Sequence, residues 1–114
     1  MTNTVANTIY QQLGGGRFAA MTGAKYFVAC NNGLQFRIGR NASKANVVKI
    51  TLNSLDLYDI EFIKHVEYKF TISKDGKSFK ERPESWQTVA KKESVYADML
   101  QDIFTAVTGM YTHL

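Results

Sequence analysis

The sequence predicts an α+β fold in which a curved antiparallel sheet of about five to six strands carries an N-terminal and a C-terminal helix on one face. Apolar residues recur at every fourth position near both ends of the chain, which is typical of amphipathic helices. Between them, short segments alternate apolar and polar residues, and no helical segment separates one such strand from the next. We therefore expect a single domain over residues 1–114, without a linker or an internal repeat.

The first helix is expected over residues 3–13. Val5, Ile9 and Leu13 share one face, and Asn3 or Thr4 provides an N-cap. The polar face consists of Thr, Asn and Gln without a charge. Such a face fits either a neutral solvated surface or contact with a partner or a second copy.

The glycine-rich stretch "GGGRFAAMTGAK" follows at residues 14–25. A phosphate-binding loop needs a lysine directly after its last glycine, then Ser or Thr, and a helix N-terminus. Here Lys25 follows Gly-Ala, so we do not expect a nucleotide loop. Residues 14–16 are expected to end the first helix, and residues 17–22 and 25–30 to form two strands that turn at Gly23.

The centre of the sheet is predicted by two alternating segments, 34–39 and 47–53. The Asn-Gly pair in "NNG" at 31–33 favours a type I′ hairpin turn before the first of them. Residues 40–46 form a polar, basic loop between the two. The side chains expected to point into the core are Leu34, Phe36, Ile38, Val48, Ile50 and Leu52.

A long strand is expected over residues 58–73. Lys64 interrupts its apolar set, which indicates a bulge or the rim of the sheet, with a protruding arm beyond it. Residues 73–77 predict a turn, residues 74–92 a basic hairpin or arm, and residues 86–92 a returning edge strand.

The last helix is expected over residues 94–108, with Ser94 as its N-cap and Gly109 as its C-cap. Its apolar stripe is the most regular in the chain and comprises Val95, Tyr96, Met99, Leu100, Ile103, Phe104 and Val107.

Charge is distributed unevenly along the chain. The net charge is +4, but the first 55 residues contain six bases and no acid. A second basic region interleaves lysines with Phe79 and Trp86, a combination that single-stranded nucleic-acid binding uses. The alternative is a solvated, mobile arm whose aromatic residues pack on the sheet. The candidate nucleic-acid-binding residues are Arg17, Lys25, Arg37, Arg40, Lys44, Lys49, Lys77, Lys80, Arg82 and Trp86.

No group of residues predicts catalysis, a metal site or a cofactor. Asp59 and Glu61, close to Asp56, share one face of a strand, but cross-strand pairing with Lys49 and Arg37 explains them better than a two-carboxylate mechanism. Cys30 with His65 lacks any neighbour that would activate the thiol, which we expect to be buried and inert. His65 and His113 have no acidic or thiol partner nearby in sequence, so they make no metal signature.

The cellular context expected is the cytoplasm. The N-terminus lacks the features of a signal peptide, no apolar run is long enough to cross a membrane, and the single Cys30 cannot form an internal disulfide.

Three stretches, "QQLGGGRFAAMTGAKYFV", "FRIGRNASKANVVKITLNSLDLYDIEF" and "VYADMLQDIFTAVTGMYTHL", resemble a family of small proteins from bacteriophages, prophages and other mobile elements. The resemblance covers most of the chain; it implies an origin in mobile elements, and with it a bacterial host cell, but no chemistry. Residues 67–92 are longer than the corresponding link in typical members.

These observations predict a small, non-enzymatic accessory protein that binds nucleic acid through a basic surface. The alternative is a protein-binding module that modulates a host or defence complex or associates with itself. Nucleic acid, a host or phage protein and a second copy are therefore the possible partners, and no membrane is expected.

Overall fold

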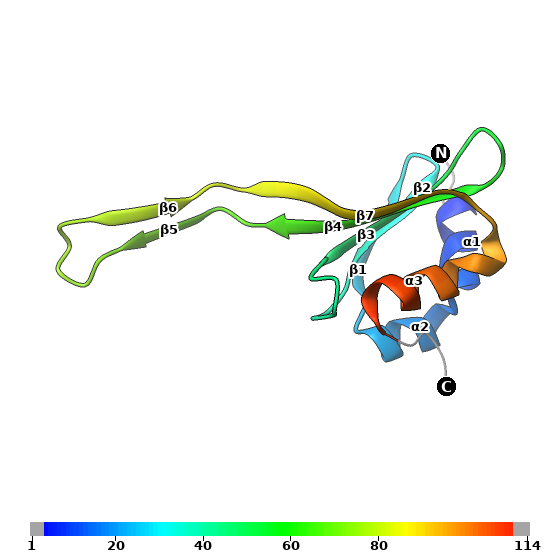
Figure 1. Ribbon diagram of the computed structural model, residues 1–114, viewed down its shortest axis with the longest axis horizontal. Coiled ribbons are helices and arrows are strands. Elements are labelled where there is room, and N and C mark those ends of the chain that lie inside the picture. Colours follow the sequence, from blue (N-terminus) through cyan, green and yellow to red (C-terminus); the bar gives the residue numbers. More distant parts are fainter. Residues whose placement is uncertain (1–3, 111–114) are drawn as a thin grey trace.

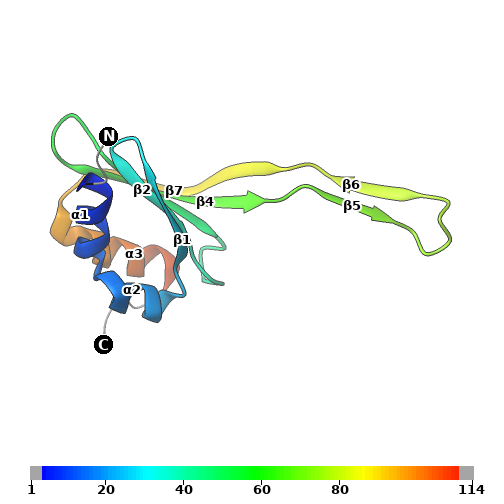
Figure 2. The same ribbon diagram turned by 180° about the vertical axis from the view of Figure 1, so that it is seen from behind.

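The computed structural model describes residues 4–110 and has the α+β architecture expected from the sequence (Figure 1). A five-stranded antiparallel sheet has the order β1-β2-β3-β4-β7, and β5 and β6 form a separate two-stranded sheet. The helices lie on one face of the larger sheet (Figures 1 and 2). The elements are α1 (Thr4–Leu13), α2 (Gly15–Thr22), β1 (Lys25–Cys30), β2 (Gly33–Arg37), β3 (Val47–Leu52), β4 (Tyr58–Val66), β5 (Lys69–Ile72), β6 (Phe79–Arg82), β7 (Ser85–Val95), the 3₁₀ turn η1 (Ala97–Met99) and α3 (Leu100–Thr108).

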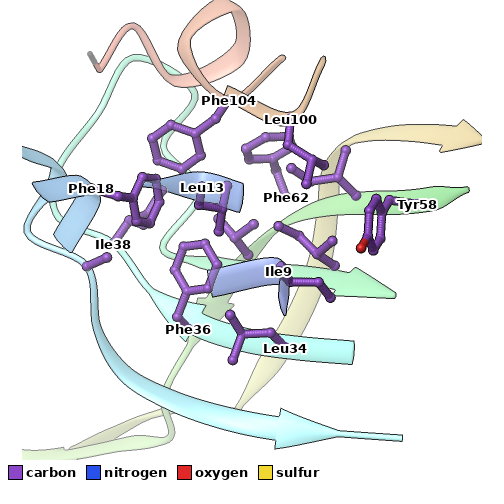
Figure 3. Close-up of a cluster of buried hydrophobic side chains, with 14 of the residues drawn as sticks. Ile9, Leu13, Phe18, Leu34, Phe36, Ile38, Tyr58, Phe62, Leu100 and Phe104 are labelled. Atoms are coloured by element: carbon purple, nitrogen blue, oxygen red, sulfur yellow. The ribbon is translucent and has the colours of Figure 1, made fainter. Parts of the chain in front are cut away.

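The hydrophobic core lies between this sheet and the helices (Figure 3). Phe18 of α2 stands edge-on to Phe36 of β2, with ring centroids 5.5 Å apart, and to Phe104 of α3, at 5.0 Å. Ile9 and Leu13 bring the apolar face of α1 into the same cluster and are fully buried. The predicted alternation is confirmed in β2 and β3, whose inward-facing side chains belong to this core or, as Leu52, pack against it.

Residues 17–22 are six of the eight residues of α2, so the prediction of a strand there is wrong. Phe18 and Thr22 lie one helical turn apart on the buried face, and the Thr22 hydroxyl donates to the Phe18 carbonyl at 2.8 Å. The apolar density suggested a strand, but two alanines favour a helix and the burial follows a four-residue period. Gly23 has φ 70° and ends α2 as a left-handed C-cap rather than linking two strands.

The β1–β2 hairpin has the predicted position but a different turn. Cys30 and Gly33 are Cα partners, so Asn31 and Asn32 form the loop, and of these two only Asn32 has a positive φ, 57°. A type I′ turn requires positive φ at both positions. Gly33 instead lies in the strand, where a Cβ atom would overlap the carbonyl oxygen of Ile50 in β3.

The chain leaves the sheet between β4 and β7. The register shifts between Phe62 and Ile63, because Val89 is an extra residue in β7, and Lys64 nearby is exposed. Val66 and Ser85 are the last Cα partners in the sheet. Residues 67–84, which we call the arm, project beyond this point (Figures 1 and 2), whereas residues 85–92 of the predicted arm belong to β7, the expected edge strand.

The arm dominates the shape of the molecule. The radius of gyration is 16.5 Å and the longest dimension is 55 Å. A compact domain of this length would have a radius of gyration of about 13 Å. The charged and aromatic groups of the arm are therefore held well away from the core.

The C-terminal helix begins later than predicted. Ser94 lies in β7 with φ 54°, and η1 separates β7 from α3, so Ser94 is not an N-cap. Val95 is buried as the end of β7, whereas Tyr96 and Met99, both expected in the apolar stripe, are exposed. Gly109 is the C-cap, as predicted, with φ 76°. Asn3, the alternative cap of the first helix, lies outside the described residues.

Candidate nucleic-acid interface

The arm is a two-stranded ribbon with chemically different faces. Cross-strand partners share a face, and Ile72 is paired with Phe79 while Phe70 is paired with Glu81. We call Tyr68, Phe70, Ile72 and Phe79 the apolar face; their exposed fractions lie between 51% and 65%. The Phe70 and Phe79 rings are stacked with centroids 5.4 Å apart. An exposed apolar surface of this kind is a candidate interaction site.

Glu81 is the cross-strand partner of Phe70, so this acidic side chain lies on the apolar face of the arm. It accepts a hydrogen bond from the Tyr68 hydroxyl at 2.7 Å. This hydrogen bond to the carboxylate, with a smaller contribution from desolvation, raises the pKa of Tyr68. The phenol therefore keeps its proton and fixes Glu81 on the apolar side of the arm.

The opposite side of the arm is basic. Lys69 and Arg82 are direct Cα partners, and Lys80 is paired with Thr71. We call Lys69, Lys80 and Arg82 the basic face; all three are exposed. Like charges directly opposite each other on paired strands are destabilising. An anion bound between these side chains would relieve that repulsion.

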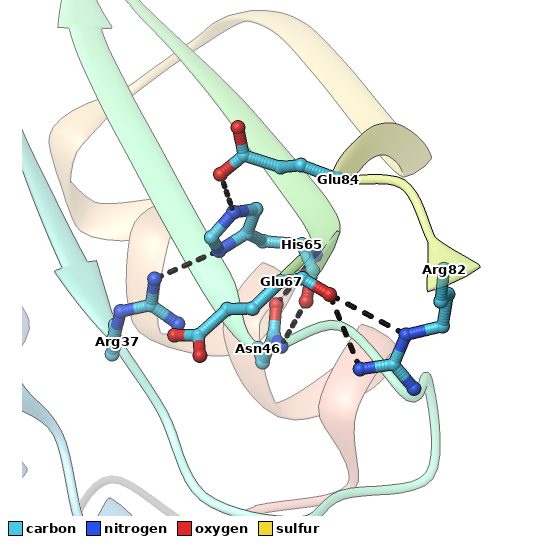
Figure 4. Close-up of polar contacts among 6 residues, drawn as sticks. All are labelled: Arg37, Asn46, His65, Glu67, Arg82 and Glu84. Atoms are coloured by element: carbon cyan, nitrogen blue, oxygen red, sulfur yellow. Dashed lines mark hydrogen bonds and ion pairs between the residues drawn. The ribbon is translucent and has the colours of Figure 1, made fainter. Parts of the chain in front are cut away.

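Acidic side chains do not neutralise the basic face within the described part of the chain. The Arg82 guanidinium donates to the main-chain carbonyl of Glu67, at 3.2 and 3.4 Å, and not to a carboxylate (Figure 4). Among residues 4–110, the carboxylates that contact a basic side chain are Glu84, which contacts His65, and Glu93, which pairs with Lys91; both contacts lie outside this face. Its cations are therefore available to a ligand.

The tip of the arm is an ordered turn that carries Lys74 and Lys77. The Asp75 carboxylate accepts hydrogen bonds from the Ser73 hydroxyl and from the Lys77 amide, at 2.5 and 3.0 Å. These hydrogen bonds, the Ser73 hydroxyl first, lower the pKa of Asp75. The carboxylate is thus used to shape the turn.

A polar cluster fixes the base of the arm (Figure 4). His65, near the end of β4, has an exposed fraction of only 7%. The Arg37 guanidinium donates to its Nδ1 at 2.8 Å, and its Nε2 lies 2.7 Å from a carboxylate oxygen of Glu84. Because arginine can only donate, Nδ1 must be the acceptor and the proton must be on Nε2, which donates to Glu84.

The backbone of His65 is fixed as well. The side-chain amide of Asn46 accepts from the His65 amide at 2.7 Å and donates to the His65 carbonyl at 2.8 Å. His65 is also the Cα partner of Trp86, and the two rings stack with centroids 3.8 Å apart and an interplanar angle of 19°. Trp86 is therefore positioned through His65 by residues from three separate segments, the end of β2 and the connections before β3 and β7.

The sequence-predicted bases are divided among several places. Lys80 and Arg82 lie together on the arm, and Lys77 lies at its tip. Lys25 is the Cα partner of Arg37 at the end of the sheet from which the arm projects. Arg40 and Lys44 are exposed in the loop between β2 and β3, at this same end.

Two predicted residues lie apart from this group. Arg17 is exposed on α2, and Lys49 lies in the middle of β3 between its partners Gln35 and Glu61. Lys49 therefore faces an acid, as the cross-strand prediction required. Three residues of the site, Lys69, His65 and Glu84, were not among the predicted binding residues. Lys69 could have been predicted, because it alternates in sequence with the aromatic residues Tyr68 and Phe70.

The candidate catalytic and metal-binding residues have structural contacts. Asp59 accepts from the Ser94 amide and the Asn53 side chain, and Glu61 accepts from the Thr88 hydroxyl. Asp59 therefore does not pair with Arg37, which contacts His65. Cys30 is a free, half-buried thiol, less buried than expected. His113 lies outside the described residues, and within residues 4–110 no cluster of metal-ligating side chains occurs.

None of the helices in the described part of the chain has the length and hydrophobicity needed to traverse a bilayer. No family model, curated protein or solved structure matches the chain. The resemblance to proteins of phages and other mobile elements therefore stays a prediction.

Proposed function

We propose that the protein binds nucleic acid and that the basic face of the arm is the principal contact. The observation that carries this proposal is the direct pairing of Lys69 with Arg82, next to Lys80, on a projecting two-stranded ribbon. Residues 69–82 contain five lysines and arginines against two acidic residues. Clustered cations of this kind bind phosphates and release counterions.

The geometry of the arm suits such a ligand. A two-stranded ribbon is narrow enough to enter a nucleic-acid groove or to lie along a single strand. Lys25, Arg37, Arg40 and Lys44, at the arm end of the sheet, extend the positive surface toward the body of the protein. A strand bound along the arm would thus continue to meet cations as it approached the sheet.

The test compares salt dependence in two matched variants. In the arm variant Lys69, Lys80 and Arg82 are all changed to Gln, and in the control variant Lys49, Lys91 and Lys92 are changed to Gln. Both lose three positive charges, but only the first loses the basic face. Binding is measured by fluorescence anisotropy of a labelled oligonucleotide, as a single strand and as a duplex, over a range of salt concentrations.

We expect the arm variant to bind more weakly and to reduce the slope of log affinity against log salt by roughly 2, which is the contribution of three phosphate contacts on a single strand. The control variant should change the slope by much less. Equal losses in the two variants would contradict the arm as the contact, and absence of binding to either probe at low salt would contradict the function itself.

The apolar face favours a second candidate function, association of the protein with a second copy of itself. An isolated two-stranded hairpin is marginally stable in water, so a cover over Phe70 and Phe79 would stabilise the arm. Two arms packed face to face would match apolar surface with apolar surface and leave both basic faces outward. They would bury roughly 400 Å² on each copy, about half of a standard interface, so the dimer should be weak.

Sedimentation velocity at increasing protein concentration tests this association. We expect a concentration-dependent dimer that the double substitution Phe70→Ser, Phe79→Ser converts to a monomer. Leu55→Ser, at a residue 69% exposed in the loop between β3 and β4, is the control and should leave the dimer intact. A wild-type protein that stays monomeric at all concentrations would exclude this second function.

A further inference from the structure

We infer that Trp86 is a stacking platform for an unpaired nucleobase, so that the nucleic acid recognised is single-stranded. This inference rests on the proposed function and specifies its ligand. Trp86 is 54% exposed although His65 covers one face of its ring. The exposed area must therefore include the other face of the indole, which is available to a flat aromatic ligand.

The platform is held in place before any ligand arrives. His65 cannot rotate without losing its bonds to Arg37 and Glu84, and its backbone is bonded to Asn46. The indole stacks on this fixed ring in nearly parallel planes. A ligand that stacks on Trp86 thus meets a side chain that has already lost much of its freedom, which lowers the entropic cost of binding.

The groups bonded to the His65 ring are one cation and one carboxylate, so the positive charge for the phosphates comes from the basic face of the arm. Arg37 lies on the far edge of the His65 ring, and the Glu84 carboxylate accepts from the Nε2–H of the same ring. Trp86 lies four residues along the chain from Arg82 of the basic face, a span of about 13 Å in extended chain. A base on Trp86 and phosphates on the basic face would therefore belong to neighbouring parts of one strand.

The exposed indole face distinguishes single strands from duplexes. Inside a duplex both faces of a base are covered by neighbouring base pairs, so stacking on a side chain requires a base that is unpaired or flipped out. Single-strand-binding proteins combine this stacking with cations that follow the backbone. Trp86 and the basic face supply those two elements at the base and along the length of the arm.

The experiment exploits the fact that Trp86 is the only tryptophan of the chain. Its intrinsic fluorescence is followed during titration with an unlabelled oligothymidylate, and binding is followed in parallel by anisotropy of the labelled strand. We expect the emission to be quenched in step with binding, and a duplex of the same length to bind more weakly and to leave the emission unquenched.

Two variants separate stacking from mere packing on His65. Trp86→Phe keeps an aromatic ring, and Trp86→Leu keeps an apolar side chain that cannot stack. We expect Trp86→Phe to retain most of the single-strand affinity and Trp86→Leu to lose roughly 5- to 150-fold, which corresponds to about 1–3 kcal/mol for one stacked base. Circular dichroism of both variants checks that the fold is retained.

The outcomes distinguish this inference from the proposed function. If anisotropy reports salt-dependent binding while the Trp86 emission is unchanged, or if the Phe and Leu variants bind equally well, the stacking platform is wrong and nucleic-acid binding stands. Equal affinity and equal quenching with the duplex would overturn the choice of single strands. No binding at low salt would overturn the proposed function together with this inference.

Discussion

Replacing Phe104 with alanine is expected to lower the free energy of unfolding by about 3–5 kcal/mol. Phe104 is fully buried and joins α3 to the rest of the core, with its ring centroid 5.0 Å from that of Phe18 and 6.1 Å from that of Phe62. The truncation removes apolar contacts with α2 and with the sheet and leaves a cavity between three elements. Domains of this size have a total stability of about 5–15 kcal/mol, so the variant should be near the limit of folding.

Urea denaturation followed by far-ultraviolet circular dichroism measures this loss. Phe79→Ala is the matched control, because it is the same substitution at a residue 65% exposed on the arm. We expect the control to change the free energy of unfolding of the five-stranded sheet and its helices only slightly. A loss in Phe104→Ala no larger than that in Phe79→Ala would show that α3 is not part of the cooperative core.

Replacing Gly33 with alanine is expected to cost about 3 kcal/mol. The added Cβ would overlap the carbonyl oxygen of Ile50 and would lie 2.8 Å from Cγ2 of Thr51. The first of these is a backbone atom in the neighbouring strand, so no side-chain rotation can relieve the overlap. The β2–β3 ladder, in which Gly33 is paired with Thr51, must shift instead.

Gly16→Ala is expected to have the opposite effect on the stability of the protein. Gly16 is exposed on α2, and a Cβ atom there would meet nothing within 4 Å. Alanine at this position should stabilise the protein by about 0.5–1 kcal/mol, because glycine loses more backbone entropy in a helix. Thermal unfolding of the two variants should thus move in opposite directions, and a stable Gly33→Ala protein would contradict the close approach of β2 and β3.

The elements that sequence patterns predicted well are those in which one face is buried. In β2 and β3, strict alternation identifies the core residues, because the pleat alternates side chains and only one face meets the helices. Residues 17–22 could not be assigned in this way. A short apolar segment has no clear period of its own, and contacts of Phe18 with Phe36 and Phe104 decide that it is a helix.

The candidate site was only partly accessible to the same reasoning. Lys80, Arg82 and Trp86 could be selected because bases and aromatics are close together in sequence. The cluster around His65 could not, since Arg37, Asn46 and Glu84 come from segments that meet only through the register of the sheet. The stacking of Trp86 on His65 could not be predicted either, because it depends on the register of β4 with β7.

The pairing of Val66 with Ser85 has a consequence for how this chain can vary. These two residues are the last partners of the β4–β7 ladder, so the intervening 67–84 segment is an insertion into a β-hairpin whose two stems belong to the body. The buried core draws none of its residues from that segment. Chains that exchange it for a short turn, or for a ribbon with other side chains, would keep the same scaffold while changing what they recognise. The fold thus separates the part that maintains stability from the part to which we assign the proposed ligand contact, and the two can diverge independently.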